Sequence, residues 1–271
     1  MMKKFMIALS LCLPISASGQ SLADSIALLA TQELHLDPRN CLSEYSRFDF
    51  SKLWAFGVKH FYDGFVGDWM QRIRMKFCAV KKIRPQHYLV SGFVQYESRM
   101  WAFRGAIDVY DIRRFNYVRE VCDDDYPISK IQAAGVLLGK YSFFLSDSSV
   151  LVGNCCGAWF IDSTSHVRGD YRGDCSDRFI NNRFAGTFIQ NHPHLNMNMA
   201  LGDYRIPFSR DLDIGVGEFY PNPKYASKGW QSYINAYSDT AFIPALDSVY
   251  WPCSDQGSRT SHNTPKKDAR H

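Results

Sequence analysis

The sequence lacks several features that would place it in a well-marked class of protein. After residue 19, no apolar run approaches the roughly 20 residues that a helix needs to span a bilayer. The charge is nearly balanced, with 31 basic against 27 acidic residues, whereas nucleic-acid binding normally requires basic residues gathered on one face. Nucleophile-elbow, Walker and His-Glu-x-x-His motifs are absent. Paired C-x-x-C spacing is absent too, which argues against a cysteine zinc site.

The first 19 residues have the parts of an export signal. Lys3 and Lys4 form a basic start, residues 5–15 are mostly apolar, and residues 17–19 are small enough for cleavage. Cleavage there predicts a signal peptide at 1–19 and leaves 252 of the 271 residues, with 29 basic and 27 acidic side chains. We therefore expect a secreted or periplasmic protein without a transmembrane segment in its mature chain.

Whether the cysteines form disulfides depends on this prediction, because exported proteins fold in an oxidising compartment. Most cysteines should pair there, and each native bridge contributes about 2–4 kcal/mol. Seven of the eight cysteines remain after cleavage, so at least one thiol stays free or bonds another chain. The disulfide candidates are Cys41, Cys78, Cys122, Cys155, Cys156, Cys175 and Cys253. The pairing is left open, except that adjacent cysteines in a strand point to opposite faces and should not bond to each other.

Alternating polar and apolar residues predict a mainly β protein. Aromatic residues make up 15% of the chain, which favours strands because flat rings pack well on a pleated surface. From residue 71 the hydrophobic period is two, and short turn-rich segments between the runs favour antiparallel pairing. The expected strands are 71–79, 87–97, 101–109, 136–145, 154–162, 183–190, 197–205 and 214–220.

Eight antiparallel strands with one apolar face predict an up-and-down barrel, similar in style to lipocalin and avidin barrels. A two-sheet sandwich is the alternative. The barrel is preferred because several strands carry a glycine followed by an aromatic residue, as at Gly157 and Trp159 and at Gly186 and Phe188. Interior glycines allow the sharp bends that barrel closure requires.

Helical periodicity is confined to the N-terminal part, at residues 21–36 and 51–62. After the signal peptide, the expected organisation has four parts. These are an N-terminal helical segment at 20–66, an antiparallel β domain at 67–222, a C-terminal extension packed on that domain at 223–253, and a disordered tail at 254–271.

Arg72, Arg74 and Lys76 alternate with apolar residues in the first expected strand. This spacing places three cations on one side of the strand. We interpret that side as a solvated strand face rather than as a nucleic-acid surface.

The candidate catalytic residues are Asp211, Asp213 and Glu218. If Asp211 and Asp213 lie on one strand they share a face, with Cα atoms roughly 6.5–7 Å apart. Two carboxylates at such a separation could act as acid and base on a glycosidic bond. The alternative is a turn whose acids are satisfied by backbone N–H groups and by Arg205 or Arg210.

Aromatic side chains on the inner face could line a pocket for a small apolar molecule or a sugar ring, or they could simply fill the core. The candidate ligand contacts are Trp101, Phe103, Trp159 and Phe188. His192 and His194 are the candidate metal pair, but no carboxylate or cysteine lies at a useful offset from them. Neither a metal nor another cofactor is predicted.

Three segments carry a resemblance to a family of proteins: residues 71–77 (QRIRMKF), 181–188 (NNRFAGTF) and 202–219 (GDYRIPFSRDLDIGVGEF). They resemble an uncharacterised family of secreted bacterial β-rich proteins with no assigned activity, over roughly residues 65–230. The resemblance implies an exported β domain and transfers no site residue.

The sequence favours a secreted or periplasmic, non-catalytic binding or envelope protein whose partner is an unknown small ligand or envelope protein. One alternative is a secreted hydrolase that uses the acidic residues near 211–218. The other is a structural interaction module that presents strand edges or loops to a partner.

Overall fold

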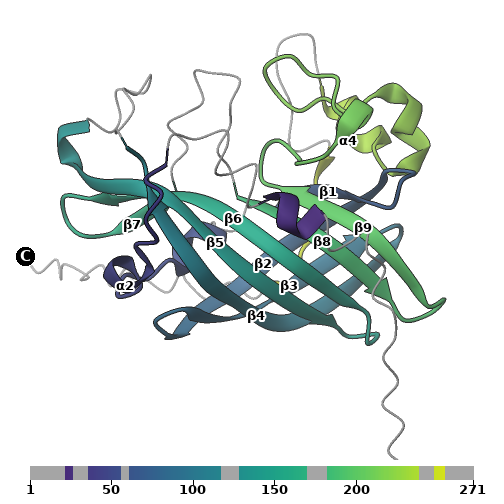
Figure 1. Ribbon diagram of the computed structural model, residues 1–271. Coiled ribbons are helices and arrows are strands. Elements are labelled where there is room, and N and C mark those ends of the chain that lie inside the picture. Colours follow the sequence, from purple (N-terminus) through teal and green to yellow (C-terminus); the bar gives the residue numbers. More distant parts are fainter. Residues whose placement is uncertain are drawn as a thin grey trace, which may run out of the picture.

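The computed structural model describes residues 22–26, 36–55, 61–116, 128–169, 182–237 and 247–253. The predictions for residues 1–19 and 254–271 lie outside these ranges, as do Cys122 and Cys175. Within them the protein is mainly β and forms a single antiparallel sheet that closes in a ring (Figure 1). The mainly β, antiparallel fold class expected from the sequence is confirmed.

The strands are β1 (Tyr62–Val66), β2 (Gln71–Arg84), β3 (His87–Tyr96), β4 (Arg99–Arg114), β5 (Ile131–Leu145), β6 (Val150–Asp162), β7 (Val167–Gly169), β8 (Arg183–Gln190) and β9 (Leu195–Gly202). The helices are α2 (Leu42–Tyr45), α3 (Ser51–Trp54) and α4 (Gln231–Ala236), with 3-10 turns η1 (Ile128–Lys130), η2 (Arg210–Leu212) and η3 (Pro223–Lys228). Residues 22–26 are helical as well.

The ring closes through two pairings, β5 with β6 and β1 with β9. β6 is long enough to pair with two strands along the same edge. Its residues 150–156 pair with β8, and its residues 159–161 pair with β7. β7 therefore continues the line of β8 at one end of the barrel.

The interior of the barrel is filled by aromatic rings. Phe77, Phe103, Phe143 and Phe184 form one cluster, with ring centroids 5.0 to 6.2 Å apart in the contacting pairs. An inward-facing glycine makes room for one of them, because a Cβ built on Gly92 would lie 2.8 Å from the Phe103 ring. The predicted combination of interior glycines and aromatic residues thus has a packing reason as well as a bending one.

The segment before β1 extends this core at the end where β2 stops and β3 starts. The rings of Tyr45 and Phe50 lie 5.0 and 5.6 Å from that of Trp159, and the Trp54 ring lies 5.2 Å from that of Tyr88. All five side chains are buried. The N-terminal segment therefore contributes core residues to the barrel.

Two sequence predictions of local structure are wrong. The helix expected at 51–62 ends at Trp54, and Tyr62 instead begins β1, whose five residues are all buried. The strand expected at 214–220 is a loop with one bridge from Asp213 to Pro221. The Asp213 carboxylate accepts hydrogen bonds from the backbone N–H groups of Gly215 and Tyr220, which curls this segment on itself. Of the helix expected at 21–36, residues 22–26 are helical, and residues 27–35 lie outside the described ranges.

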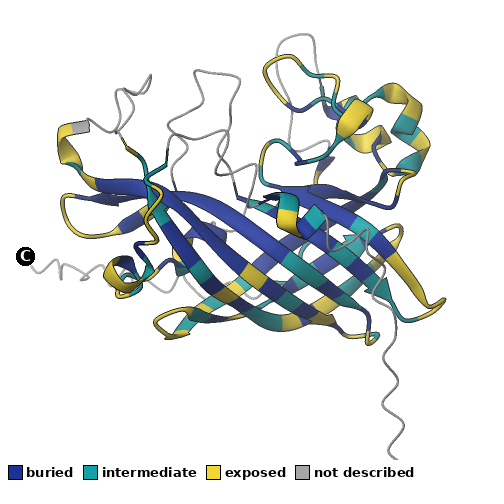
Figure 2. Ribbon diagram, in the orientation of Figure 1, coloured by how far each residue is buried: buried dark blue, intermediate teal, exposed yellow. Residues whose placement is uncertain are grey.

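Two short layers cover parts of the outer wall. The C-terminal layer of η3 and α4 lies over β1 and β9, where the buried Trp230 indole donates a hydrogen bond to the Met70 carbonyl at 2.9 Å (Figure 1). The helical turn at 22–26 packs Ile26 in the same outer cluster as Leu138, and the Asn154 side chain donates to the Ala23 carbonyl. Between these layers, exposed and half-buried residues reach the surface on β2 to β5 (Figure 2).

Candidate functional site

A buried charge network joins the segment 247–253, here named the C-terminal strap, to the outer side of β2. The Arg72 guanidinium donates to both carboxylate oxygens of Asp247 at 2.8 and 2.6 Å, and its Nε donates to Asp63 at 2.8 Å. Arg74 donates to the Asp247 carbonyl at 2.9 Å and to its carboxylate at 3.4 Å. Two cations thus face two anions, and their side chains are at most 11% exposed.

The expectation that Arg72, Arg74 and Lys76 form a solvated face is wrong, because each is 5% exposed or less. Asp247 of the strap contacts Arg72 and Arg74, Ser232 of α4 contacts Arg72, and the Arg72 guanidinium also lies 5.0 Å from the ring centroid of Trp230. Burial alone would raise the pKa of Asp247, but the hydrogen bonds and charges of the two arginines outweigh it and hold that pKa below 3.8. The Asp247 carboxylate is therefore ionised at neutral pH.

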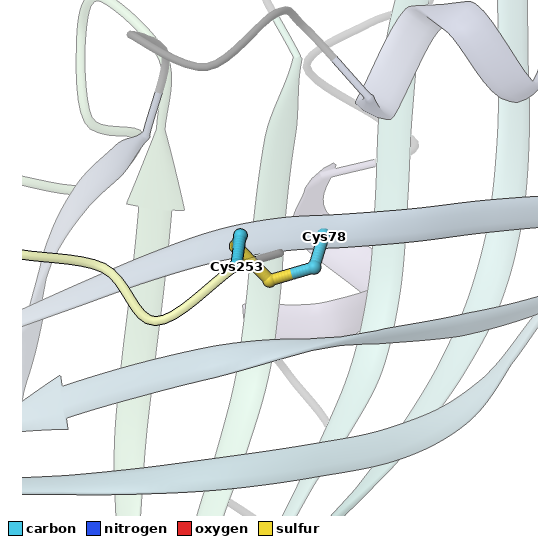
Figure 3. Close-up of a disulfide and its surroundings, with 2 residues drawn as sticks. All are labelled: Cys78 and Cys253. Atoms are coloured by element: carbon cyan, nitrogen blue, oxygen red, sulfur yellow. A yellow bond between two sulfur atoms is a disulfide. The ribbon is translucent and has the colours of Figure 1, made fainter. Parts of the chain in front are cut away.

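A disulfide fastens the far end of the strap. Cys253 is bonded to Cys78 of β2, with Cα atoms 5.3 Å apart (Figure 3). Cys41 and Cys155 are buried free thiols, and burial raises the pKa of Cys155 well above its ordinary value, so that its nucleophilic thiolate is disfavoured. Cys155 lies in the interior cluster and Cys156 in the outer one, so the two neighbours do not bond to each other, as expected.

Beside the strap, the outer wall of β2 to β5 carries two adjoining open hollows of about 540 Å³ each, which we name together the outer groove. Ser91, Arg104 and Phe144 line both hollows. The first hollow is the one that Lys81 and Leu89 line, and the second hollow is the one that Pro252 and Cys253 of the strap bound. The groove therefore begins where the C-terminal strap ends.

Small side chains in register across the strands form the floor of the first hollow. One row runs Ala79, Ser91, Arg104, Phe144 across β2 to β5, and the next runs Lys81, Leu89, Ala106, Ser142, so that small side chains fill half of each row. Leu89 and Phe144 rise on either side of the floor and are 48 and 60% exposed. The result is a mostly apolar channel open to solvent.

The structure places the four candidate ligand residues in or against the packed core rather than around a lumen. Phe103, Trp159 and Phe188 are at most 2% exposed, and Trp101 packs against the same cluster. Phe103 alone also reaches the second hollow of the outer groove. Sequence reasoning missed the groove, since its small outward residues come from strands far apart along the chain.

The two candidate aspartates do not share a strand face. Asp211 lies in η2 and is ion-paired with Lys224, whereas Asp213 is extended and accepts a hydrogen bond from Arg205 at 2.8 Å. The turn alternative describes this geometry better, because Asp213 also binds the Gly215 N–H at 3.0 Å. A catalytic role for either residue stays a prediction.

The remaining candidates are also placed. The Glu218 carboxylate accepts a hydrogen bond from the Tyr237 hydroxyl at 3.1 Å. His192 and His194 are exposed in the turn between β8 and β9. Within the described ranges, no three histidine, cysteine, aspartate or glutamate side chains are grouped so that they could hold a metal ion.

Comparisons with known proteins supply no relative from which a role could be transferred. No family model, no curated protein and no solved structure matches this chain. The resemblance to a family of secreted bacterial proteins therefore stays a prediction. Among the described residues, no helix has the length and apolar character needed to cross a membrane.

Proposed function

We propose that this protein is an exported, non-catalytic binding protein that takes an apolar ligand on its outer groove. The observation that carries the proposal is the exposed, mostly apolar channel between Leu89 and Phe144 on the outer wall. Contiguous exposed apolar surface is one of the marks of a ligand-binding groove.

Two features support export. The N-terminal pattern of Lys3 and Lys4 followed by an apolar stretch is typical of a signal peptide. The disulfide between Cys78 and Cys253 fits an oxidising compartment, where such bonds persist. Both point to a secreted or periplasmic location.

The packed interior favours an outer site over a site inside the barrel. Eight-stranded barrels either fill their interior with side chains or hold one small ligand there. Here Phe143, Phe184 and Phe188 are fully buried and stand among other rings. Each hollow of the groove, at about 540 Å³, has a volume typical of small-molecule sites.

The proposal can be tested with N-phenyl-1-naphthylamine, a neutral apolar fluorophore that brightens when it leaves water. We expect saturable binding that Phe144→Ser weakens about fivefold to tenfold, because the variant removes most of the apolar contact on one wall. Leu195→Ser is the matched control, since Leu195 is 42% exposed on β9 and does not line the groove. Equal binding by the wild-type protein and Phe144→Ser would overturn the proposal.

A further inference from the structure

Two cations of the outer groove have no partner among the residues that the structure describes. Arg104 lines both hollows at their junction, and Lys81 lines the first one. Within the described part of the chain, neither side chain takes part in a hydrogen bond or an ion pair. This contrasts with Arg72 and Arg74 on the same barrel, each of which is held by two carboxylates.

No acid balances these two cations from the groove itself. The described residues that line the two hollows include no aspartate or glutamate. The acid that follows on β4, Asp108, is already engaged, with its carboxylate 2.6 Å from the His87 ring. The groove therefore combines an apolar floor with uncompensated positive charge, a combination that favours an anionic amphiphile.

Two other occupants fit this chemistry less well. Residues 254–271 follow the strap, but they carry four basic and two acidic side chains and alanine as their one apolar residue. A second copy docked face to face about a two-fold axis through the groove would bring Arg104 towards the Arg104 of its partner, and such like-charge contacts are costly. An external ligand with a negative head avoids both problems.

We propose that the outer groove binds a medium-chain fatty acid of about twelve carbons, with its carboxylate on Arg104 and its hydrocarbon chain between Leu89 and Phe144. This inference rests on the proposed function and adds the chemical class of the ligand. The planar guanidinium can donate two parallel hydrogen bonds to a carboxylate, and Lys81 adds a second positive charge on the same hollow. The four strands under the groove span about 14 Å, three strand spacings, which is about the length of an extended twelve-carbon chain.

The test compares three amphiphiles with the same twelve-carbon chain, below their micelle concentrations, as competitors of N-phenyl-1-naphthylamine. They are anionic dodecanoate, neutral dodecyl maltoside and cationic dodecyltrimethylammonium. We expect dodecanoate to bind about tenfold more tightly than the maltoside, and the cation to bind most weakly.

Arg104→Gln should weaken dodecanoate binding about fivefold to tenfold and leave maltoside binding unchanged. Arg99→Gln is the matched control, because Arg99 is exposed on the same strand and does not line the groove. It should change neither affinity. This pair of variants separates a loss of the local contact from a general loss of positive charge.

The possible failures are distinguishable. Equal affinities for the three head groups, or dodecanoate binding that ignores Arg104→Gln, would overturn the fatty-acid assignment while Phe144→Ser still reports on the groove. If neither the fluorophore nor any amphiphile depends on Phe144, the proposed function fails as well.

Discussion

Replacing Asp247 with asparagine would test how the C-terminal strap is held on the barrel. The wild-type network balances two arginines with two aspartates, all nearly inaccessible to solvent. Asp247→Asn keeps the shape of the side chain but removes one negative charge. Arg72 and Arg74 then share Asp63 alone, and the buried network carries an uncompensated positive charge.

The expected cost follows from that burial. Removing one partner of a buried ion pair typically destabilises a protein by about 3–5 kcal/mol, because the remaining charge stays desolvated. Asp247 is 1% exposed on its side chain and makes hydrogen bonds of 2.6 and 2.8 Å to Arg72, so the full range applies. Detachment of the strap would let water reach the arginines and would limit the loss.

The assay is urea unfolding at pH 7 followed by tryptophan fluorescence, with hydrogen exchange of residues 247–253 as a local readout. Asp211→Asn is the control, because Asp211 forms an exposed pair with Lys224 and should leave the unfolding midpoint unchanged. An Asp247→Asn protein within about 1 kcal/mol of wild type, with an equally protected strap, would refute the reasoning.

A second substitution sharpens this test. The Arg74 Nε lies 3.5 Å from Asp63 but makes no hydrogen bond, and burial lowers the pKa of Arg74, so this arginine is the less well satisfied of the two. Adding Arg74→Gln to Asp247→Asn restores a one-to-one pair of Arg72 with Asp63. The loss in free energy of unfolding should therefore be about 1–3 kcal/mol smaller for the double variant than the sum of the losses for the two single variants.

Three further outcomes are expected. Peptide mapping without reduction should find Cys78 linked to Cys253, and replacing both by serine should lower the free energy of unfolding by about 2–4 kcal/mol. Gly92→Ala should cost about 1–3 kcal/mol in thermal unfolding, because the new Cβ meets the Lys76 backbone carbonyl oxygen as well as the Phe103 ring, whereas Gly217→Ala, with open space around it, should be neutral. Because the folded pKa of Asp247 is lowered, its contribution is complete above pH 3.8 and is lost as the pH falls through the folded value. The difference in free energy of unfolding between wild type and Asp247→Asn should hence be constant around neutral pH. It should become smaller as the pH is lowered below 3.8 in an acid titration.

The sequence pattern predicted the barrel wall because period-two alternation is a property of each strand by itself. Seven of the eight expected strands form, and the strand at 183–190 has the observed bounds. β1 was missed because its five residues are too few to show alternation and all of them are buried. β7 is shorter still, at three residues.

Covering layers could not be predicted in the same way. Arg72 and Arg74 alternate as solvent-facing residues do, yet they bind Asp247 of a strap that lies 175 and 173 residues further along the chain. Alternation records that one side of a strand is polar and not what lies over it. The outer groove was hidden for a related reason, since Ala79, Ser91 and Arg104 align only once the strands are in register.

The bridge between Cys78 and Cys253 makes most of the polypeptide a covalent macrocycle that contains β3 to β9. If a protease cut any one peptide bond between residues 79 and 252, the two resulting pieces would stay joined through sulfur. If the protein is exported, as we propose, a single nick would leave every strand tethered beside its neighbours, and the wall that carries the groove would stay in one covalent piece.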